Sequence, residues 1–300
     1  MFMSPEAEAL WADMWTERLE RSSFDLARER EAAEGAGDVL PHPVGVSYRV
    51  EVVAGLNVLI AEPQRISDPE AIIMWIHGGA FTLMSAHTHR HFAGHLAAEM
   101  GSVIALPDYS LAPESPFPAA LNELANVCGV LAQAEPGQPF ILIGDSAGGA
   151  LAVGVQMRLR EFGAPQPALT ALLCPWLDLT LTNDSISDNA ELDAVLDATT
   201  LLANVELYLN GIPSDHPPAS PIHGDLNGLG PVYLQAAEHD VLVDDAVMFT
   251  RKARLHGVDV EIEIAAEVPH CYQFFAGVIP EADMAISRLA ATIHARIASC

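Results

Sequence analysis

The 300-residue sequence has little positive charge, and it has no long apolar run. It contains 14 lysine and arginine residues against 40 aspartate and glutamate residues, which gives a formal net charge of -26. A surface this negative repels nucleic acids and anionic membranes, and the sequence predicts neither as a partner. No apolar stretch is long enough to span a bilayer, so we expect no membrane insertion. The expected partner is a neutral or cationic small molecule.

The sequence is also poor in cysteine, and its four cysteines form no recognisable metal or redox motif. No Cys-x-x-Cys spacing occurs among Cys128, Cys174, Cys271 and Cys300. This distribution disfavours a disulfide framework and a zinc ribbon, and it fits a reducing compartment. We therefore predict a cytoplasmic protein.

The apolar segments that are present alternate between strand-like and helix-like lengths. The runs 46–53 and 56–60 flank Ala54-Gly55 and predict an antiparallel hairpin. Further runs of parallel-strand length, most of them separated by helix-like stretches, follow at 71–76, 103–106, 140–143, 169–174, 232–236 and 260–264. This order predicts an α/β fold with a mostly parallel, doubly wound sheet and helices on both faces.

The N-terminal region lies outside this alternation. Residues 1–34 are predicted to form an amphipathic helix rather than a cleavable signal, because acids and arginines separate the apolar side chains Trp11, Met14, Trp15 and Leu19. We assign residues 1–45 to an N-terminal helical cap segment. The two tryptophans and Met14 are expected to pack within this cap.

A second break in the alternation follows Asp178. Polar turns, one amphipathic stretch over residues 192–209 and a proline-rich run follow in this region. We therefore predict a second cap segment at about 182–213, inserted into a catalytic domain that spans residues 46–300.

The clearest chemical motif follows the predicted strand 140–143. Residues 141–149 have the sequence Ile-Leu-Ile-Gly-Asp-Ser-Ala-Gly-Gly and precede a helix-prone stretch. An apolar strand, Gly-x-Ser-x-Gly and a helix form a nucleophile elbow, in which the serine lies on a strained turn. Bulky side chains at Gly144 or Gly148 would clash with neighbouring backbone there. Ser146 is the predicted nucleophile.

An oxyanion-binding loop is expected directly after the strand 71–76. The segment His77-Gly78-Gly79-Ala80-Phe81 contains small residues that allow backbone N–H groups to point at one centre. In folds with a nucleophile elbow, this loop and the N–H after the nucleophile form the hole together. The predicted donors are therefore Gly78, Gly79 and Ala147.

The acid and the base are expected after later strands. Asp240 lies just beyond the strand-like run 232–236 and is the preferred acid, with Asp244 as the alternative. Asp244 and its neighbour Asp245 are also suited to begin a helix, where carboxylates complement the helix dipole. His270, on a loop after the last predicted strand, would be the base. The order serine, acid, histidine is that of α/β-hydrolases.

With these motifs, the chain resembles the hormone-sensitive-lipase-like α/β-hydrolases, the bacterial family IV carboxylesterases. The resemblance rests on the His-Gly-Gly loop at 77–81, the block Asp-Tyr-Ser-Leu-Ala-Pro-Glu at 108–114 and Gly-Asp-Ser-Ala-Gly-Gly at 144–149. It implies the same triad of Ser146, Asp240 and His270 and the same oxyanion donors. It also implies a cap over the acyl pocket, no cofactor and frequent homodimers.

Three positions depart from the family pattern. Ala80 replaces the usual third glycine of the loop, at little cost if its φ angle is negative. Ser110 replaces a common arginine and removes a charge that could brace neighbouring loops. Val241 replaces the proline that usually follows the acid.

The combined prediction is a serine carboxylesterase for short- to medium-chain esters, with no metal or organic cofactor. Lactone, aryl-ester and amide hydrolysis stay open as alternatives, and a receptor without catalysis is a further one. Histidines cluster at 87, 89, 91 and 95, with His91 and His95 one helical turn apart, but no carboxylate or cysteine nearby completes a metal site. Cys271 lies outside any elbow and is interpreted as packing, with no histidine expected to activate it.

Overall fold

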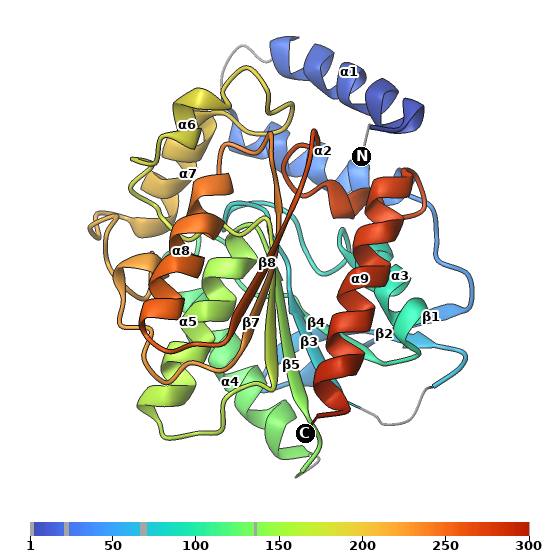
Figure 1. Cartoon of the computed structure of the whole chain (residues 1–300), viewed down its shortest axis with the longest axis vertical. Coiled ribbons are helices and arrows are strands. Elements are labelled where there is room, and N and C mark those ends of the chain that lie inside the picture. The colour runs from blue at the N-terminus through green and yellow to red at the C-terminus, as the bar shows by residue number, and fades with distance from the viewer. Residues whose placement is uncertain (1–2, 21–23, 67–70, 135–136, 300) are drawn as a thin grey trace.

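The computed structural model describes residues 3–20, 24–66, 71–134 and 137–299, and Cys300 lies outside them. Within the described residues the strands form an eight-stranded sheet in the order β1-β2-β4-β3-β5-β6-β7-β8 (Figure 1). The pairings β1·β2 and β2·β4 are antiparallel, and those from β4 through β8 are parallel. The strands are β1 Val46–Val53, β2 Leu56–Pro63, β3 Ile72–Ile76, β4 Ile104–Pro107, β5 Phe140–Asp145, β6 Leu169–Leu173, β7 Val232–Ala237 and β8 Val260–Ala265.

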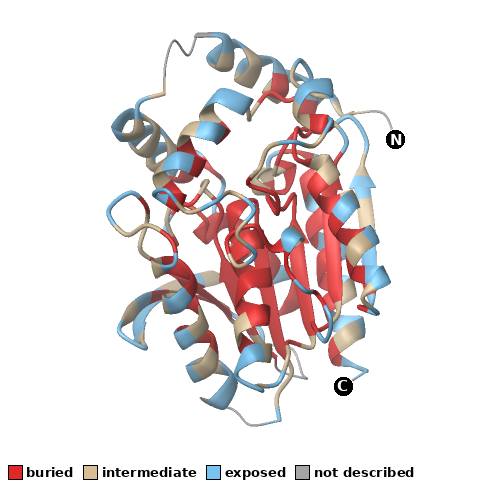
Figure 2. Ribbon diagram, turned by 90° about the vertical axis from the view of Figure 1, so that its left-hand side faces the viewer, coloured by how far each residue is buried: buried red, intermediate tan, exposed pale blue. Residues whose placement is uncertain are grey.

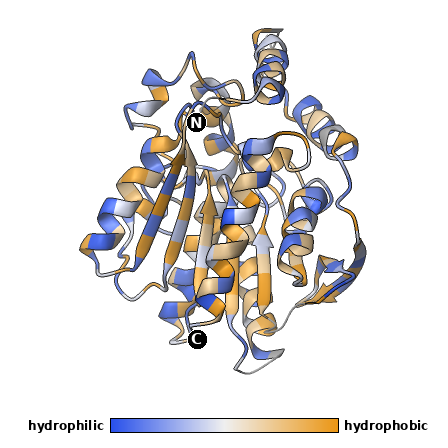
Figure 3. Cartoon of the chain, turned by 45° about the vertical axis from the view of Figure 1, so that its right-hand side comes forward, coloured by the Kyte–Doolittle hydropathy of each residue, from blue (hydrophilic) through white to orange (hydrophobic). Residues whose placement is uncertain are grey.

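Helices cover both faces of this sheet. One face packs against α3 (Arg90–Met100) and α9 (Pro280–Ile297), and the other packs against α4 (Ala119–Ala134), α5 (Ala147–Glu161) and α8 (Val243–Leu255). The central strands are buried on both sides, as Figure 2 shows in red. Burial on both sides explains why these strands are mostly apolar rather than apolar only at alternate positions (Figure 3). The predicted doubly wound α/β fold is confirmed.

The predicted hairpin is also confirmed. β1 and β2 pair from Val46 with Pro63 to Val53 with Leu56. Ala54 and Gly55, which join them, have φ angles of 51° and 85°. Positive φ at both central residues is the conformation that suits the twist of a two-residue hairpin.

The N-terminal region differs from the expected single helix. It contains α1 (Pro5–Glu20) and α2 (Leu26–Val39), and residues 1–2 and 21–23 of the predicted helix lie outside the described part of the chain. Asp25 begins α2, because its side chain accepts hydrogen bonds from the main-chain N–H groups of Ala27 and Arg28. The amphipathic pattern continues across the break, which is why the sequence alone suggested one helix.

The second predicted cap segment contains the short helix α6 (Ser185–Asp188) and α7 (Ala198–Leu209). The expected amphipathic helix over 192–209 is therefore wrong in its first part. Asp197 begins α7 by accepting a hydrogen bond from Thr200 N, and Asp193 accepts from Val195 N and Leu196 N within a turn. These carboxylates accept hydrogen bonds from main-chain N–H groups that would otherwise donate within a helix beginning before Ala198.

We use the word cap for α1, α2 and residues 182–213. In Figure 1 these elements lie together at one end of the sheet, and α8 and α9 flank the strands below them. None of the described helices is both long and apolar enough to cross a membrane.

Candidate active site

Ser146 lies on the turn between β5 and α5, as the elbow motif predicts. Its φ and ψ angles are 50° and -122°, a conformation that non-glycine residues adopt only under constraint. A Cβ atom on Gly144 would clash with the backbone of Gly148, and one on Gly148 would clash with the backbone of Ile76. The glycines thus allow the strand, the turn and the helix to approach closely enough to fix Ser146.

The structure brings the predicted triad together at hydrogen-bonding distance. Ser146 Oγ lies 2.9 Å from His270 Nε2, and His270 Nδ1 lies 2.8 Å from Asp240 Oδ2. Because the carboxylate can only accept, Nδ1 carries the proton and Nε2 is the acceptor for Ser146. The alternative acid, Asp244, accepts a hydrogen bond from Ser185 N at 3.0 Å instead. Its position in the first turn of α8 fits the role in helix initiation.

The electrostatics around His270 stabilise the imidazolium that forms when the ring takes the proton of Ser146. Burial opposes charge on the ring, but the charge and hydrogen bond of Asp240 outweigh burial and raise the pKa of His270 above its usual value. All three triad residues are buried. A ring in this environment can accept the proton of Ser146 and keep it next to a counter-charge.

The loop after β3 carries main-chain N–H groups toward the nucleophile. Gly79 has a φ angle of +107°, and a Cβ atom there would clash with the backbone of Leu83, so glycine is required. Ala80 has a φ angle of 51°, so the condition under which alanine would cost little here is not met, and the loop contains a strained residue. No other described residue accepts a hydrogen bond from the N–H of Gly79, Ala80 or Ala147.

Gly78 differs from the other predicted donors. Its N–H donates to Asp145 Oδ2 at 3.0 Å, so it is already engaged. The adjacent His77 Nδ1 donates to the Gly78 carbonyl at 2.7 Å. In this geometry Gly78 orients the loop rather than facing the reacting centre.

Asp145, next to the nucleophile, connects the elbow to the oxyanion loop, a role that the motif did not reveal. Its carboxylate accepts hydrogen bonds from Trp75 Nε1 at 2.8 Å, His89 Nε2 at 3.0 Å and the N–H of Gly78. Burial opposes ionisation, but His89 and Trp75 outweigh it, and the pKa of Asp145 is lowered. The Gly-Asp-Ser sequence contained the signal, because an acid before a buried nucleophile requires partners.

The acid loop, residues 238–244, is held from the cap. Asn189 Nδ2 donates to the carbonyls of Glu238 and Asp240, each at 2.8 Å. The buried Asp193 accepts a hydrogen bond from Val241 N at 3.0 Å, which a proline at this position could not donate. Ser185 Oγ donates to the Val241 carbonyl at 2.7 Å. These contacts join segments about 50 residues apart that share no motif.

The N-terminal cap segment contacts the end of the oxyanion loop and the second cap segment. Arg30 of α2 donates to the Thr82 carbonyl at 2.8 Å and to Glu114, with N···O distances of 2.7 Å. Arg30 thus links α2 to this region, and Ser110, where the family pattern has an arginine, donates to Glu123. Arg18 of α1 donates to main-chain carbonyls of the second cap segment.

A cavity of about 360 Å³ lies between α1, the second cap segment and the loops that carry the acid and the base. Trp11 and Trp15 line it, together with His239 and Pro269, the neighbours of Asp240 and His270. Trp11 is buried against Phe275, with ring centroids 5.5 Å apart, whereas Leu19 is 79% exposed. Trp11 therefore packs against the catalytic domain, and the expectation that it packs within the cap is wrong.

Two residues considered for other chemistry can now be placed. His91 packs edge-on against His42, with centroids 4.2 Å apart, and belongs to no group of converging metal ligands among the described residues. Cys271 Sγ lies 3.4 Å from His270 Nε2, so a histidine is within reach of the thiol, contrary to the expectation that none is placed to activate it. Desolvation raises the pKa of the Cys271 thiol well above its usual value, so it is a poor nucleophile.

Comparison with known proteins agrees with this geometry. A family model described as alpha/beta hydrolase fold matches residues 73–274. An acetyl-hydrolase of Streptomyces hygroscopicus is 37% identical over 215 residues, which cover 71% of this chain and 72% of the relative. An esterase of Acinetobacter venetianus is 35% identical over 221 residues, 73% of each protein. The crystal structure of an esterase from the bacterial hormone-sensitive lipase family matches with a TM-score of 0.93 and 31% identity, over 99% of this chain and 100% of the other.

The chain belongs to the α/β-hydrolase family. Within it, the protein is a hormone-sensitive-lipase-like carboxylesterase, a hydrolase of carboxylic esters.

Proposed function

We propose that the protein is a serine esterase that hydrolyses short-chain carboxylic esters through an acyl-enzyme. Ser146 Oγ attacks the ester carbonyl while His270 Nε2 takes its proton, and Asp240 stabilises the resulting imidazolium. His270 then protonates the departing alcohol and next removes a proton from the water that hydrolyses the acyl-enzyme. The distances of 2.9 Å and 2.8 Å along the Ser146, His270 and Asp240 chain carry this proposal.

The oxyanion formed in each step would be bound by the N–H groups of Gly79, Ala80 and Ala147. Ala147 begins α5, so its N–H has no partner within the helix and lies at the positive end of the helix dipole. Preorganised donors of this type each change kcat by a factor on the order of 10² to 10³. Gly78 contributes indirectly, because its bond to Asp145 fixes the loop.

A short acyl chain is supported by aromatic packing behind the oxyanion loop. Phe81 stacks on Tyr208 of α7, with ring centroids 3.8 Å apart, and both side chains are buried. Trp176, also buried, lies with its ring centroid 5.6 Å from that of Phe81. Rings packed this closely leave little depth for a long chain. The name of the acetyl-hydrolase relative points in the same direction.

The test compares initial rates on p-nitrophenyl esters of increasing acyl length with rates on lactones. We expect the highest kcat/KM for acetate or butyrate, and loss of hydrolysis by at least about a thousandfold in Ser146→Ala. Asp240→Asn should lose about 10⁴-fold in kcat, whereas Asp244→Asn, the matched control in the same loop, should mainly lower the melting temperature. Faster turnover of lactones would assign the protein as a lactone hydrolase, and no turnover by folded protein would favour a receptor. The homodimer and the cytoplasmic location stay predictions.

A further inference from the structure

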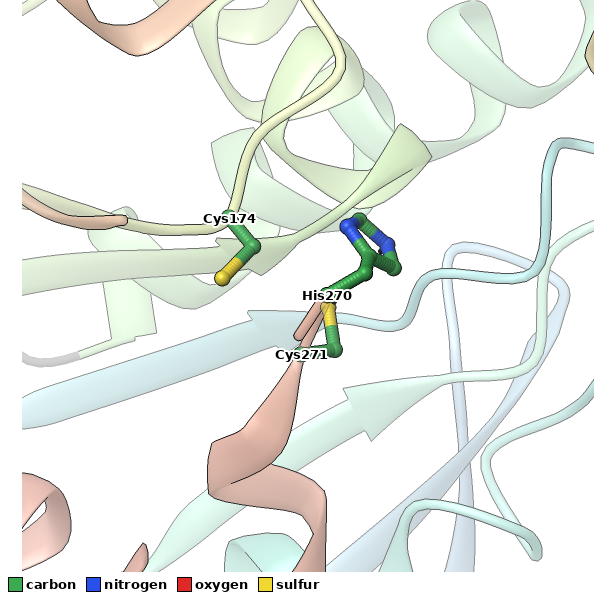
Figure 4. A group of neighbouring side chains, drawn as sticks. All are labelled: Cys174, His270 and Cys271. Atoms are coloured by element: carbon green, nitrogen blue, oxygen red, sulfur yellow. Dashed lines mark hydrogen bonds between the residues drawn. The ribbon is translucent and has the colours of Figure 1, made fainter. Parts of the chain in front are cut away.

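Two cysteine thiols lie beside the histidine of the triad. Cys174 follows β6, and His270 and Cys271 lie on the loop after β8, so the carboxyl ends of two strands bring them together (Figure 4). The two thiol sulfurs and a ring nitrogen of His270 all lie within 4.8 Å of one another. Among the described residues, this is the one group of three or more potential metal ligands that converge in this way.

The proposed esterase mechanism uses neither thiol. Cys174 Sγ contacts Gln273 Oε1 at 3.7 Å, and Cys271 Sγ contacts the Leu173 carbonyl at 3.9 Å. Both distances are long even for sulfur, so the thiols would lose little hydrogen-bond energy on binding a ligand. Both cysteines have left-handed backbone, with φ angles of 43° and 49°. L-residues pay a conformational cost for this backbone, which is often retained near functional sites.

Two sulfurs and one imidazole nitrogen define the kind of ion that fits. Thiolate and imidazole are ligands of zinc and other soft or borderline cations, whereas magnesium and calcium select oxygen. A tetrahedral zinc ion with bonds of about 2.3 Å to sulfur and about 2.1 Å to nitrogen separates such ligands by roughly 3.5 Å. Cys271 Sγ and His270 Nε2 are already 3.4 Å apart. Movements on the order of an ångström would complete the set.

The surrounding charge also favours a cation. The carboxylate of Asp240 is bound to the opposite nitrogen of the His270 ring. The buried Asp193 lies beyond it, bonded to the N–H of Val241. A ligating histidine whose other nitrogen donates to a carboxylate is a common arrangement around zinc, because the carboxylate orients the ring.

We propose that Cys174, Cys271 and His270 form an inhibitory site for a thiophilic divalent cation such as Zn²⁺ or Cd²⁺. Each thiol releases its proton to solvent and forms a sulfur–metal bond, and no electron is transferred. The lone pair of His270 Nε2 forms the third bond and is no longer available to Ser146, whose hydrogen bond at 2.9 Å is lost. The inhibition rests on the proposed serine mechanism, but the binding of the metal does not.

The experiment titrates the full-length protein with Cd²⁺ and follows the ultraviolet charge-transfer band of cadmium thiolates. Wild type and the inactive Ser146→Ala protein should both show the band. Cys174→Ala and Cys271→Ala should each lose about half of its amplitude at saturation and bind at least tenfold more weakly. Cys128→Ala is the matched control, because Cys128 is a free, buried thiol on α4 and lies outside the cluster. It should behave as wild type.

Hydrolysis of p-nitrophenyl acetate is followed in parallel. Cd²⁺ and Zn²⁺ should inhibit wild type and Cys128→Ala, a chelator should restore the rate, and Mg²⁺ should have no effect. In each cysteine variant, the rate with metal divided by the rate without metal should move toward one, whatever the rate of that variant without metal. An unchanged band in both cysteine variants would overturn the site, and a bound metal without inhibition would overturn its inhibitory role. A normal band with no hydrolysis by any protein would instead reject the esterase proposal.

Discussion

The oxyanion loop and the acid loop flank the same nucleophile, but different parts of the molecule hold them. Asp145, at the end of β5, binds the first part of the oxyanion loop through the N–H of Gly78. The acid loop is instead held by Asn189, Asp193 and Ser185 of the second cap segment. The sheet therefore holds the start of the oxyanion loop, and the cap adds side-chain contacts to the acid loop, whose main chain is also bonded to Ala265 and Val268.

This difference connects the second cap segment to the position of Asp240. Any movement of the cap that admits substrate would be transmitted to Asp240 through Asn189 and Asp193. The oxyanion donors would be less affected, because the contacts of Asp145 all lie within the catalytic domain. Arg30 of α2, bonded to the Thr82 carbonyl, is a cap contact at the far end of that loop.

The largest effect is expected where the sheet holds the oxyanion loop. Asp145→Asn would place an amide N–H among donors from Trp75, His89 and Gly78, so at least one bond becomes a repulsive contact. We expect kcat on p-nitrophenyl acetate to fall by about 10² or more, together with a loss of about 3 kcal/mol in the free energy of unfolding.

The control for Asp145 is Trp75→Phe, which removes one donor and leaves the bonds from His89 and Gly78. It should retain most of the activity. A wild-type kcat in folded Asp145→Asn would mean that the loop keeps its position without this carboxylate, and the contrast between the two halves of the site would fail.

A smaller effect is expected where the cap holds the acid loop. Asn189→Ala removes the hydrogen bonds to the carbonyls of Glu238 and Asp240, worth about 1 kcal/mol each. Since these bonds position Asp240, we expect kcat to fall about tenfold with little change in KM, measured on the same ester.

Asp197→Ala is the matched control for Asn189→Ala. Asp197 also lies in the cap, where it begins α7 and makes no recorded contact with the acid loop. Its loss should lower the melting temperature, at about 1 kcal/mol of stability, and leave kcat nearly unchanged. Equal losses of kcat in the two variants would show that cap stability, not the contact of Asn189 with the acid loop, sets the rate.

The sequence predicted one half of this contrast better than the other. Ser146, Asp240 and His270 each follow a strand, and strand-end positions in a parallel sheet converge by topology, so local patterns were enough to find them. Asn189 and Asp193 could not be found in that way, because they lie in the turns between α6 and α7, and no local pattern shows that these turns contact the acid loop. The break between α1 and α2 was missed for a similar reason: the side chain of Asp25 overrides a continuous amphipathic pattern.

Backbone details were also beyond the sequence. The His-Gly-Gly pattern indicates that N–H groups converge, but it does not say which of them already has an acceptor. Gly78 is engaged because the peptide between His77 and Gly78 faces Asp145, and the positive φ angle of Ala80 follows from the sharp turn after Gly79. These backbone conformations depend on contacts with neighbouring strands rather than on the local sequence.

The smallest expected effect concerns pH and the oxyanion side. His77 is buried and stacks on Tyr109, with ring centroids 4.1 Å apart. Burial, followed by the charge of the neighbouring His89, lowers the pKa of His77 from its ordinary 6.5 to about 3. Below pH 6.5 the unfolded chain therefore binds a proton that the folded chain excludes. Stability is complete above this pH and falls as the pH decreases toward 3.

Between pH 6.5 and about pH 5.5, His77 should cost about 1 kcal/mol of unfolding free energy, measured by urea denaturation at each pH. His77→Asn keeps an N–H that can donate toward the Gly78 carbonyl but cannot take up a proton. Its stability should therefore decline less steeply over this range than that of wild type. Parallel declines would assign the acid sensitivity to other groups and would remove His77 from the account of how the sheet fixes the oxyanion loop.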